Sequence, residues 1–151
     1  MSKRSESAAA NIAAGKMNCS QSVLTAFSGE LGLDLALARK VALGFGGGMG
    51  RTGRTCGAVT GAYMVLGLQQ DLNAGNVQQI KDNTYARVRE FTQKFSAANG
   101  STLCKDILGC DLSTPAGAAF AKEHDLFTVL CPKFVKSAVE ILDQMSAGSS
   151  K

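Results

Sequence analysis

The sequence lacks the features of a membrane, exported or nucleic-acid-binding protein. No apolar run approaches the ~20 residues that a helix needs to cross a bilayer, and the N-terminal stretch MSKRSESAAANIAAGKMNCS has too weak an apolar centre for a secretory signal. The 16 Lys and Arg residues are interspersed with 12 Asp and Glu residues instead of forming one basic block. We therefore expect a cytoplasmic protein whose partners include neither nucleic acid nor a membrane.

The sequence also lacks the period-two alternation of β-strands, internal repeats and any long low-complexity linker. Its 151 residues are the usual size of one domain. The patterns predict an all-α, single-domain bundle of about six to eight helices over residues 1–151. The N-terminal segment 1–15 and the tail 146–151 are the parts in which we expect fraying.

The first half of the chain predicts three helices before a glycine-rich loop. The first spans 5–14, and the second begins at Cys19, because Asn18 and Gln21 have the spacing of a capping box. The third spans 33–43, with Leu37 and Val41 expected on its buried side. The glycine-rich loop then covers 44–55.

The second half predicts a long amphipathic helix over 76–98, two short helices over 102–108 and 115–123, and a last helix from Pro132. The long helix is expected to bury a stripe at spacings of three and four, namely Val77, Ile80, Thr84, Val88, Phe91 and Phe95. The last helix is expected to bury Val135, Ala138, Val139, Ile141, Leu142 and Met145. Both stripes are more typical of core packing than of a cofactor site.

The central stretch is GFGGGMGRTGRTCGAVTGAYMVLG, in which the glycine-rich loop leads into a helix that begins around Cys56. So many glycines indicate unusual backbone dihedrals or a close approach by another group. Gly57, Ala58, Gly61 and Ala62 form a small-residue face on what we expect to be the central helix. This face would suit either an internal helix contact or a homodimer.

The glycine-rich loop has two interpretations. The amides of Gly47 and Gly48, with Arg51 and Arg54, would form a site for a small anionic ligand. Alternatively, the loop is a tight connection whose arginines are solvated. It matches neither the P-loop nor the dinucleotide-binding pattern, because no GK[ST] follows it and no strand precedes it.

The five cysteines carry the strongest chemical signal. Cys19, Cys56, Cys104 and Cys131 each fall at the N-cap or in the first turn of a predicted helix, where free amides and the helix dipole favour a thiolate. No pair has the CxxC spacing of zinc ribbons or thioredoxin-like sites. Cys110 follows a helix stop, and His124, the single histidine, lies on a predicted surface turn.

With these residues identified, the chain resembles the redox-active proteins named for a C_GCAxxG_C_C signature. The matching segments are NCSQSVL with Cys19, TCGAVTGA with Cys56, LCKDILGCDLS with Cys104, and CPKFV with Cys131. The second segment departs from the literal signature, since CGAVTG stands in place of GCAxxG. The resemblance implies an all-α fold and redox activity at these four cysteines, with Cys110 as the extra one, and it names no substrate.

Three hypotheses follow. In the first, Cys56 is an attacking thiolate, and Cys19, Cys104 or Cys131 resolves it as a disulfide with an unknown redox partner. This makes the chain a candidate thiol-disulfide oxidoreductase that needs no cofactor. In the second, the same four cysteines bind an iron–sulfur cluster or a zinc ion. In the third, the cysteines are incidental and the glycine-rich loop binds an anionic ligand.

Overall fold

The computed structural model describes residues 2–149, and side chains through residue 146. The first half of the chain folds into the helices α1 (Lys3–Ala13), α2 (Cys19–Ser28) and α3 (Leu35–Ala42). The predicted capping box is confirmed: the Asn18 side chain accepts from the Gln21 amide, and the Gln21 side chain accepts from the Asn18 amide. These reciprocal bonds fix the start of α2, and therefore the place of Cys19.

The chain continues through a short 3₁₀ turn, η1 (Leu43–Phe45), and a compact turn, α4 (Gly46–Met49). The remaining helices are α5 (Gly57–Leu68), α6 (Val77–Asn99), α7 (Cys104–Leu108), α8 (Pro115–Glu123), α9 (Leu126–Val129) and α10 (Cys131–Ser149). The predicted all-α class is confirmed, since the described residues contain no strand and only one isolated bridge, between Thr55 and Leu103. None of the described helices is long and apolar enough to cross a membrane.

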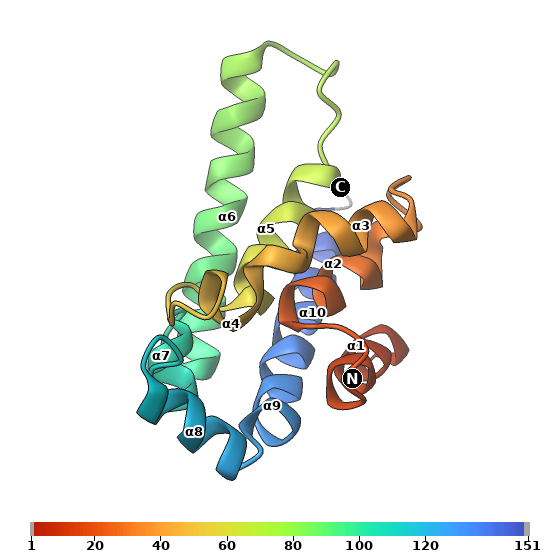
Figure 1. Cartoon of the computed structure of the whole chain (residues 1–151). Helices are drawn as coiled ribbons and strands as arrows, with labels where there is room; N and C mark the ends of the chain where they lie inside the picture. The colour runs from red at the N-terminus through yellow and green to blue at the C-terminus, as the bar shows by residue number, and fades with distance from the viewer. Residues whose placement is uncertain (1, 150–151) are drawn as a thin grey trace.

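The core lies where α2, α5 and α10 meet, with α1 packed against α10 and α3 against α2 (Figure 1). The small-residue face of α5 makes an internal helix contact with α2, the first of the two predicted alternatives. Gly61 lies so close to α2 that a Cβ there would be 2.8 Å from the backbone oxygen of Ser20. Every residue expected to be buried on the last helix, from Val135 to Met145, is buried.

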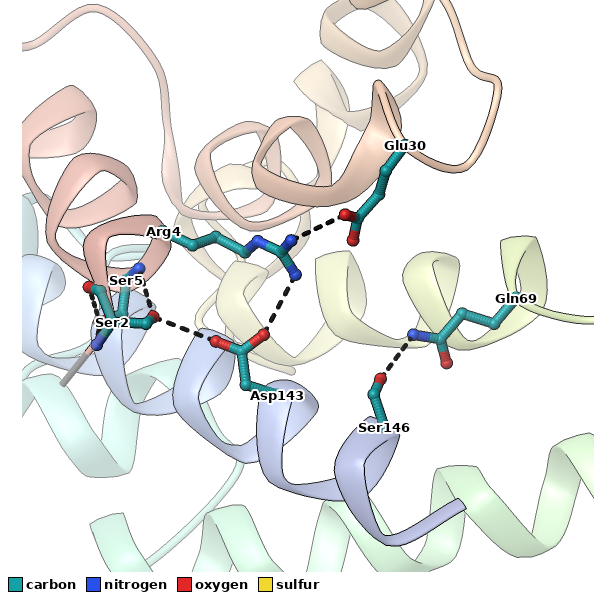
Figure 2. A network of polar contacts seen from close by, with 7 residues as sticks. All are labelled: Ser2, Arg4, Ser5, Glu30, Gln69, Asp143 and Ser146. Carbon is teal, nitrogen blue, oxygen red and sulfur yellow. Dashed lines mark hydrogen bonds and ion pairs between the residues drawn. The ribbon is translucent and has the colours of Figure 1, made fainter. Parts of the chain in front are cut away.

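Arg4 ties the N-terminal helix to this core (Figure 2). Its guanidinium pairs with Glu30 at 2.8 Å and with Asp143 of α10 at 3.1 Å. The same group lies 4.4 Å from the ring centre of Phe27. Within the segment 1–15, Lys3–Ala13 forms a helix, and the expected fraying of this segment stays a prediction. The predicted tail 146–151 continues α10 as far as Ser149, and residues 150–151 lie outside the described part.

The predicted buried side of α3 is wrong. Leu37 and Val41 are 52% and 53% exposed, whereas Ala38 and Ala42 are fully buried. The helix also begins at Leu35, after an N-cap at Asp34, instead of at residue 33. Small alanines allow the α3 backbone to lie close to α2, and this close packing turns the larger side chains outward.

The predicted stripe of α6 is buried at one end only. Phe91 and Phe95 are fully buried, but Val77 is 73% exposed, and the other three members of the stripe are half-buried. Figure 1 shows the reason, because the N-terminal half of α6 extends beyond the other helices. An amphipathic pattern predicts a helix and its apolar face, and it does not predict how much of that face another element covers.

Candidate functional site

The glycine-rich loop forms a left-handed turn. Five consecutive residues, from Gly47 to Arg51, have φ between +63° and +71°. The turn is held by the Arg51 amide, which donates to the carbonyl of Gly46 at 3.1 Å, and by the Arg54 amide, which donates to the carbonyl of Gly48 at 3.1 Å. Left-handed backbone costs non-glycine residues about 1–2 kcal/mol each, so the strain falls on Met49 and Arg51. Such strain is concentrated at functional sites in proteins.

Two glycines allow cysteine-bearing segments to approach this loop. A Cβ on Gly48 would lie 2.7 Å from the Cβ of Cys104, and one on Gly57 would lie 3.0 Å from the Cβ of Cys19. The first distance is too short for a real Cβ, and the second is tighter than most Cβ contacts in proteins. The missing Cβ atoms therefore give Cys104 and Cys19 the space they occupy.

The segment before α5 and the segment before α7 are held together through their backbones. The Cys104 amide donates to the carbonyl of Arg54 at 2.6 Å, and the Cys56 amide donates to the carbonyl of Thr102 at 2.8 Å. These bonds flank the isolated bridge between Thr55 and Leu103. The pairing fixes Cys56 and Cys104 relative to one another although 48 positions separate them in the chain.

All four predicted cysteines occupy helix starts. Cys19, Cys104 and Cys131 are the first residues of α2, α7 and α10, and Cys56 is the N-cap of α5. The four side chains line one cavity of about 540 Å³. All are buried, with exposed fractions of 8% or less.

Cys56 and Cys19 have opposite electrostatic character. A hydrogen bond from Cys19 lowers the pKa of Cys56, and the backbone amides of Ala58 and Val59 lower it further, while burial opposes both. The pKa of Cys19 is raised well above its usual value by its hydrogen bonds with Cys131 and Cys56 and by burial. Of the pair, Cys56 is therefore the residue that ionises more readily, and Cys19 is the one that holds its proton more strongly.

Cys104 and Cys110 both favour the neutral thiol. Burial raises the pKa of Cys104 to about 12, with smaller contributions from the charges of Cys56 and Cys131. Burial and the charge of Asp111 raise the pKa of Cys110. Cys110 is half-buried and does not line the cavity. Neither residue matches Cys56 as a nucleophile.

The other predicted site residues divide into two groups. Gly47, Gly48 and Arg51 line the cavity, whereas Arg54 is exposed and does not. His124 does not line the cavity either: its ring stacks on Phe120 at 4.0 Å, and its Nδ1 lies 3.0 Å from the Phe120 carbonyl.

Sequence reasoning missed the apolar part of the cavity wall. Phe127 belongs to α9, a four-residue helix too short to produce a periodic signal, and Phe134 was not assigned to a site. Asn18 was identified only as a cap. Its Nδ2 also donates to the carbonyl of Leu43 at 2.9 Å, which ties the start of α2 to the segment before the glycine-rich loop.

All five cysteines are free thiols in this structure. Within residues 2–149, no three His, Cys, Asp or Glu side chains have the arrangement of ligands around one metal ion. The hypothesis of an iron–sulfur or zinc site at Cys19, Cys56, Cys104 and Cys131 therefore stays a prediction.

The fold and the cavity define a class of all-α protein in which a set of helix-start cysteines lines one pocket. A protein-family match over residues 17–145 carries the description "Putative redox-active protein (C_GCAxxG_C_C)". The chain belongs to this family, as the signature-like segments predicted. Searches of curated proteins and of solved structures found no match.

Proposed function

We propose that the protein is a thiol-disulfide oxidoreductase in which Cys56 is the nucleophile and Cys19 is the resolving thiol. The observation that carries this proposal is the placement of both cysteines in the wall of one cavity, where the Cys19 Cβ packs against Gly57, the residue after Cys56, and where the pKa of Cys56 is lowered and that of Cys19 raised. This placement pairs a thiolate-favouring sulfur with a protonated neighbour, which is the arrangement that a two-step exchange requires. The family description supports a redox role.

In the first step, the Cys56 thiolate attacks one sulfur of an incoming disulfide. A Cys56–substrate disulfide forms, the substrate S–S bond breaks, and the second substrate sulfur leaves as a thiolate that takes a proton from water. Attack by a thiolate on a disulfide sulfur is the general route of such exchange. The reaction leaves Cys56 without its negative charge.

In the second step, Cys19 becomes the nucleophile. The charge of Cys56 helps to raise the pKa of Cys19, so loss of that charge makes Cys19 easier to ionise. The Cys19 thiolate attacks the Cys56 sulfur, a Cys19–Cys56 disulfide forms, and the remaining substrate thiolate leaves and is protonated. Two electrons pass from the cysteine pair to the substrate. A dithiol reductant restores the pair by the reverse exchange.

Mass spectrometry of single variants tests the two roles. Cys19→Ser protein treated with a disulfide should accumulate a stable adduct at Cys56, because no thiol resolves it. Cys56→Ser protein should form no such adduct. Cys110→Ser protein is the matched control, since Cys110 is outside the cavity, and it should lose two titratable thiols as the unmodified chain does.

Two results would contradict the assignment. If Cys19→Ser protein still loses two thiols without accumulating an adduct, Cys131 or Cys104 is the resolving thiol instead. If Cys56→Ser protein reacts as fast as the unmodified chain, Cys56 is not the nucleophile. Stoichiometric iron or zinc in protein purified without air would support the metal-binding hypothesis in place of exchange.

A further inference from the structure

The cavity that holds the four sulfurs is suited to a small molecule. Its volume of about 540 Å³ lies within the ~300–1,000 Å³ range of small-ligand sites. The exposed fraction of Cys56 is only 3%. A disulfide on the surface of a folded protein cannot reach a sulfur so deeply placed, whereas a compact molecule that enters the cavity can.

The cavity wall is mainly apolar. Besides aliphatic side chains such as Ile12 and Ile107, it includes two aromatic ones, Phe127 and Phe134. Phe127 is 40% exposed and Phe134 only 8% exposed, so one of the two aromatic residues in the wall is accessible from solvent and the other is buried. An apolar or aromatic body would gain contact area from both rings.

Apart from the cysteines, Arg51 is the only ionisable residue among the described residues that line the cavity. Its aliphatic stem packs over Gly47, where a Cβ would lie 2.7 Å from the Arg51 Cγ. Arg51 makes no ion pair with any described residue, so its guanidinium is available to an outside anion. A planar guanidinium matches the geometry of a carboxylate or sulfonate.

We propose that the cavity binds a small, largely apolar disulfide that bears an anionic group, with the apolar body against Phe127 and Phe134 and the anion on Arg51. This inference deepens the proposed function and rests on it for the exchange step. The bond changes are those of that step: Cys56 bonds to one substrate sulfur, and the other sulfur leaves as a thiolate. An aromatic leaving thiolate departs readily, because its conjugate thiol is acidic.

Binding is tested without exchange chemistry by titrating Cys56→Ser protein with anilinonaphthalene sulfonate. This probe has an apolar body and one anionic group, and it contains no disulfide. Binding should be saturable, and adding Arg51→Gln should weaken it ~tenfold, the effect of losing one charge-assisted contact. Adding Arg54→Gln is the matched control, since Arg54 is an exposed arginine of the same loop outside the cavity. It should leave the affinity unchanged.

Exchange is tested with two aromatic disulfides, the dicarboxylate dithionitrobenzoate and the neutral dithiodipyridine. Arg51→Gln in the otherwise unmodified chain should slow Cys56 adduct formation by the dicarboxylate ~tenfold and leave the rate with the neutral disulfide unchanged. Arg54→Gln should alter neither rate. Gln and Arg are both unbranched at Cβ, so Arg51→Gln adds no new backbone strain at the positive φ of this residue.

The outcomes separate the two proposals. Saturable probe binding that depends on Arg51, without any disulfide reaction at Cys56, would refute the oxidoreductase and leave the ligand site standing. Disulfide reaction at Cys56 with equal losses for Arg51→Gln and Arg54→Gln, or without saturable probe binding, would refute the ligand site and leave the oxidoreductase standing.

Discussion

Replacing Gly61 with alanine should loosen the contact between α2 and α5 that brings Cys19 to Cys56. An alanine Cβ at this position would lie 2.8 Å from the backbone oxygen of Ser20 and 3.1 Å from the Cβ of Val23. Neither neighbour is the flexible end of a side chain. The Ser20 backbone, which follows Cys19 directly, would therefore have to move.

The magnitude follows from a comparison within the same helix. Alanine is favoured over glycine in a helix by up to about 1 kcal/mol, and this gain applies to both Gly61 and Gly67 of α5. A Cβ at Gly67 meets nothing within 4 Å, so Gly67→Ala should raise the free energy of unfolding by about 0.5–1 kcal/mol. Gly61→Ala adds the cost of overpacking, about 1–3 kcal/mol. The two variants should differ by about that cost, because the helix-propensity term cancels.

Denaturant unfolding of both variants measures this difference, and alkylation of Cys56 reports on the site. In Gly61→Ala protein, Cys19 is displaced, so Cys56 loses the hydrogen bond that contributes most to lowering its pKa. The midpoint of its alkylation pH profile should therefore shift upward, while Gly67→Ala leaves the profile unchanged. Equal stability and equal alkylation profiles in the two variants would refute the packing of α2 on α5.

Two further predictions concern pH and the N-terminal helix. Burial raises the pKa of Cys104 from an ordinary value of 9.0 to about 12 in the folded protein. The unfolded chain therefore releases this proton first, and the free energy of unfolding should fall as the pH rises from about 9 to about 12. In denaturant titrations, Cys104→Ala should make this fall shallower, and an unchanged dependence on pH would count against burial of that thiol. Arg4→Ala removes two ion pairs and a contact with Phe27 and should lower the unfolding free energy by about 1–2 kcal/mol. Arg4→Lys should lower it less. If denaturant unfolding shows the same free energy for both variants as for the unmodified chain, α1 is held by apolar packing alone.

The sequence predicted those elements whose signals are local. Asn18 and Gln21 fix the start of α2, and Thr114 with Pro115 fixes the start of α8, because a cap depends on residues three positions apart. The buried face of α10 was also predictable, since a helix in the core buries its whole apolar stripe. A cap is predicted without knowing which element packs against which, and a stripe is predicted correctly only where other elements cover the whole of it, as in α10.

The failures arise where packing between elements decides the outcome. Leu37 is exposed because Ala38 allows α3 to pack closely on α2. Val77 is exposed because the N-terminal half of α6 extends beyond the other helices. Neither fact is encoded in the periodicity of the helix concerned. The cavity wall contributed by Phe127 is a similar case, since a helix of four residues has no period to detect.

From the sequence, the glycine-rich loop and the cysteines support two separate hypotheses: the loop predicts an anion site, and the cysteines predict thiol chemistry. In the structure they depend on each other: Gly48 provides the space for Cys104, and Gly57 provides the space for Cys19. Arg51 belongs to the same left-handed turn as Gly48 and lines the same cavity as the sulfurs. A substitution in the turn should therefore alter thiol reactivity and ligand binding together. Gly48→Ala, which places a Cβ against the Arg54 backbone at 2.6 Å, should impair both.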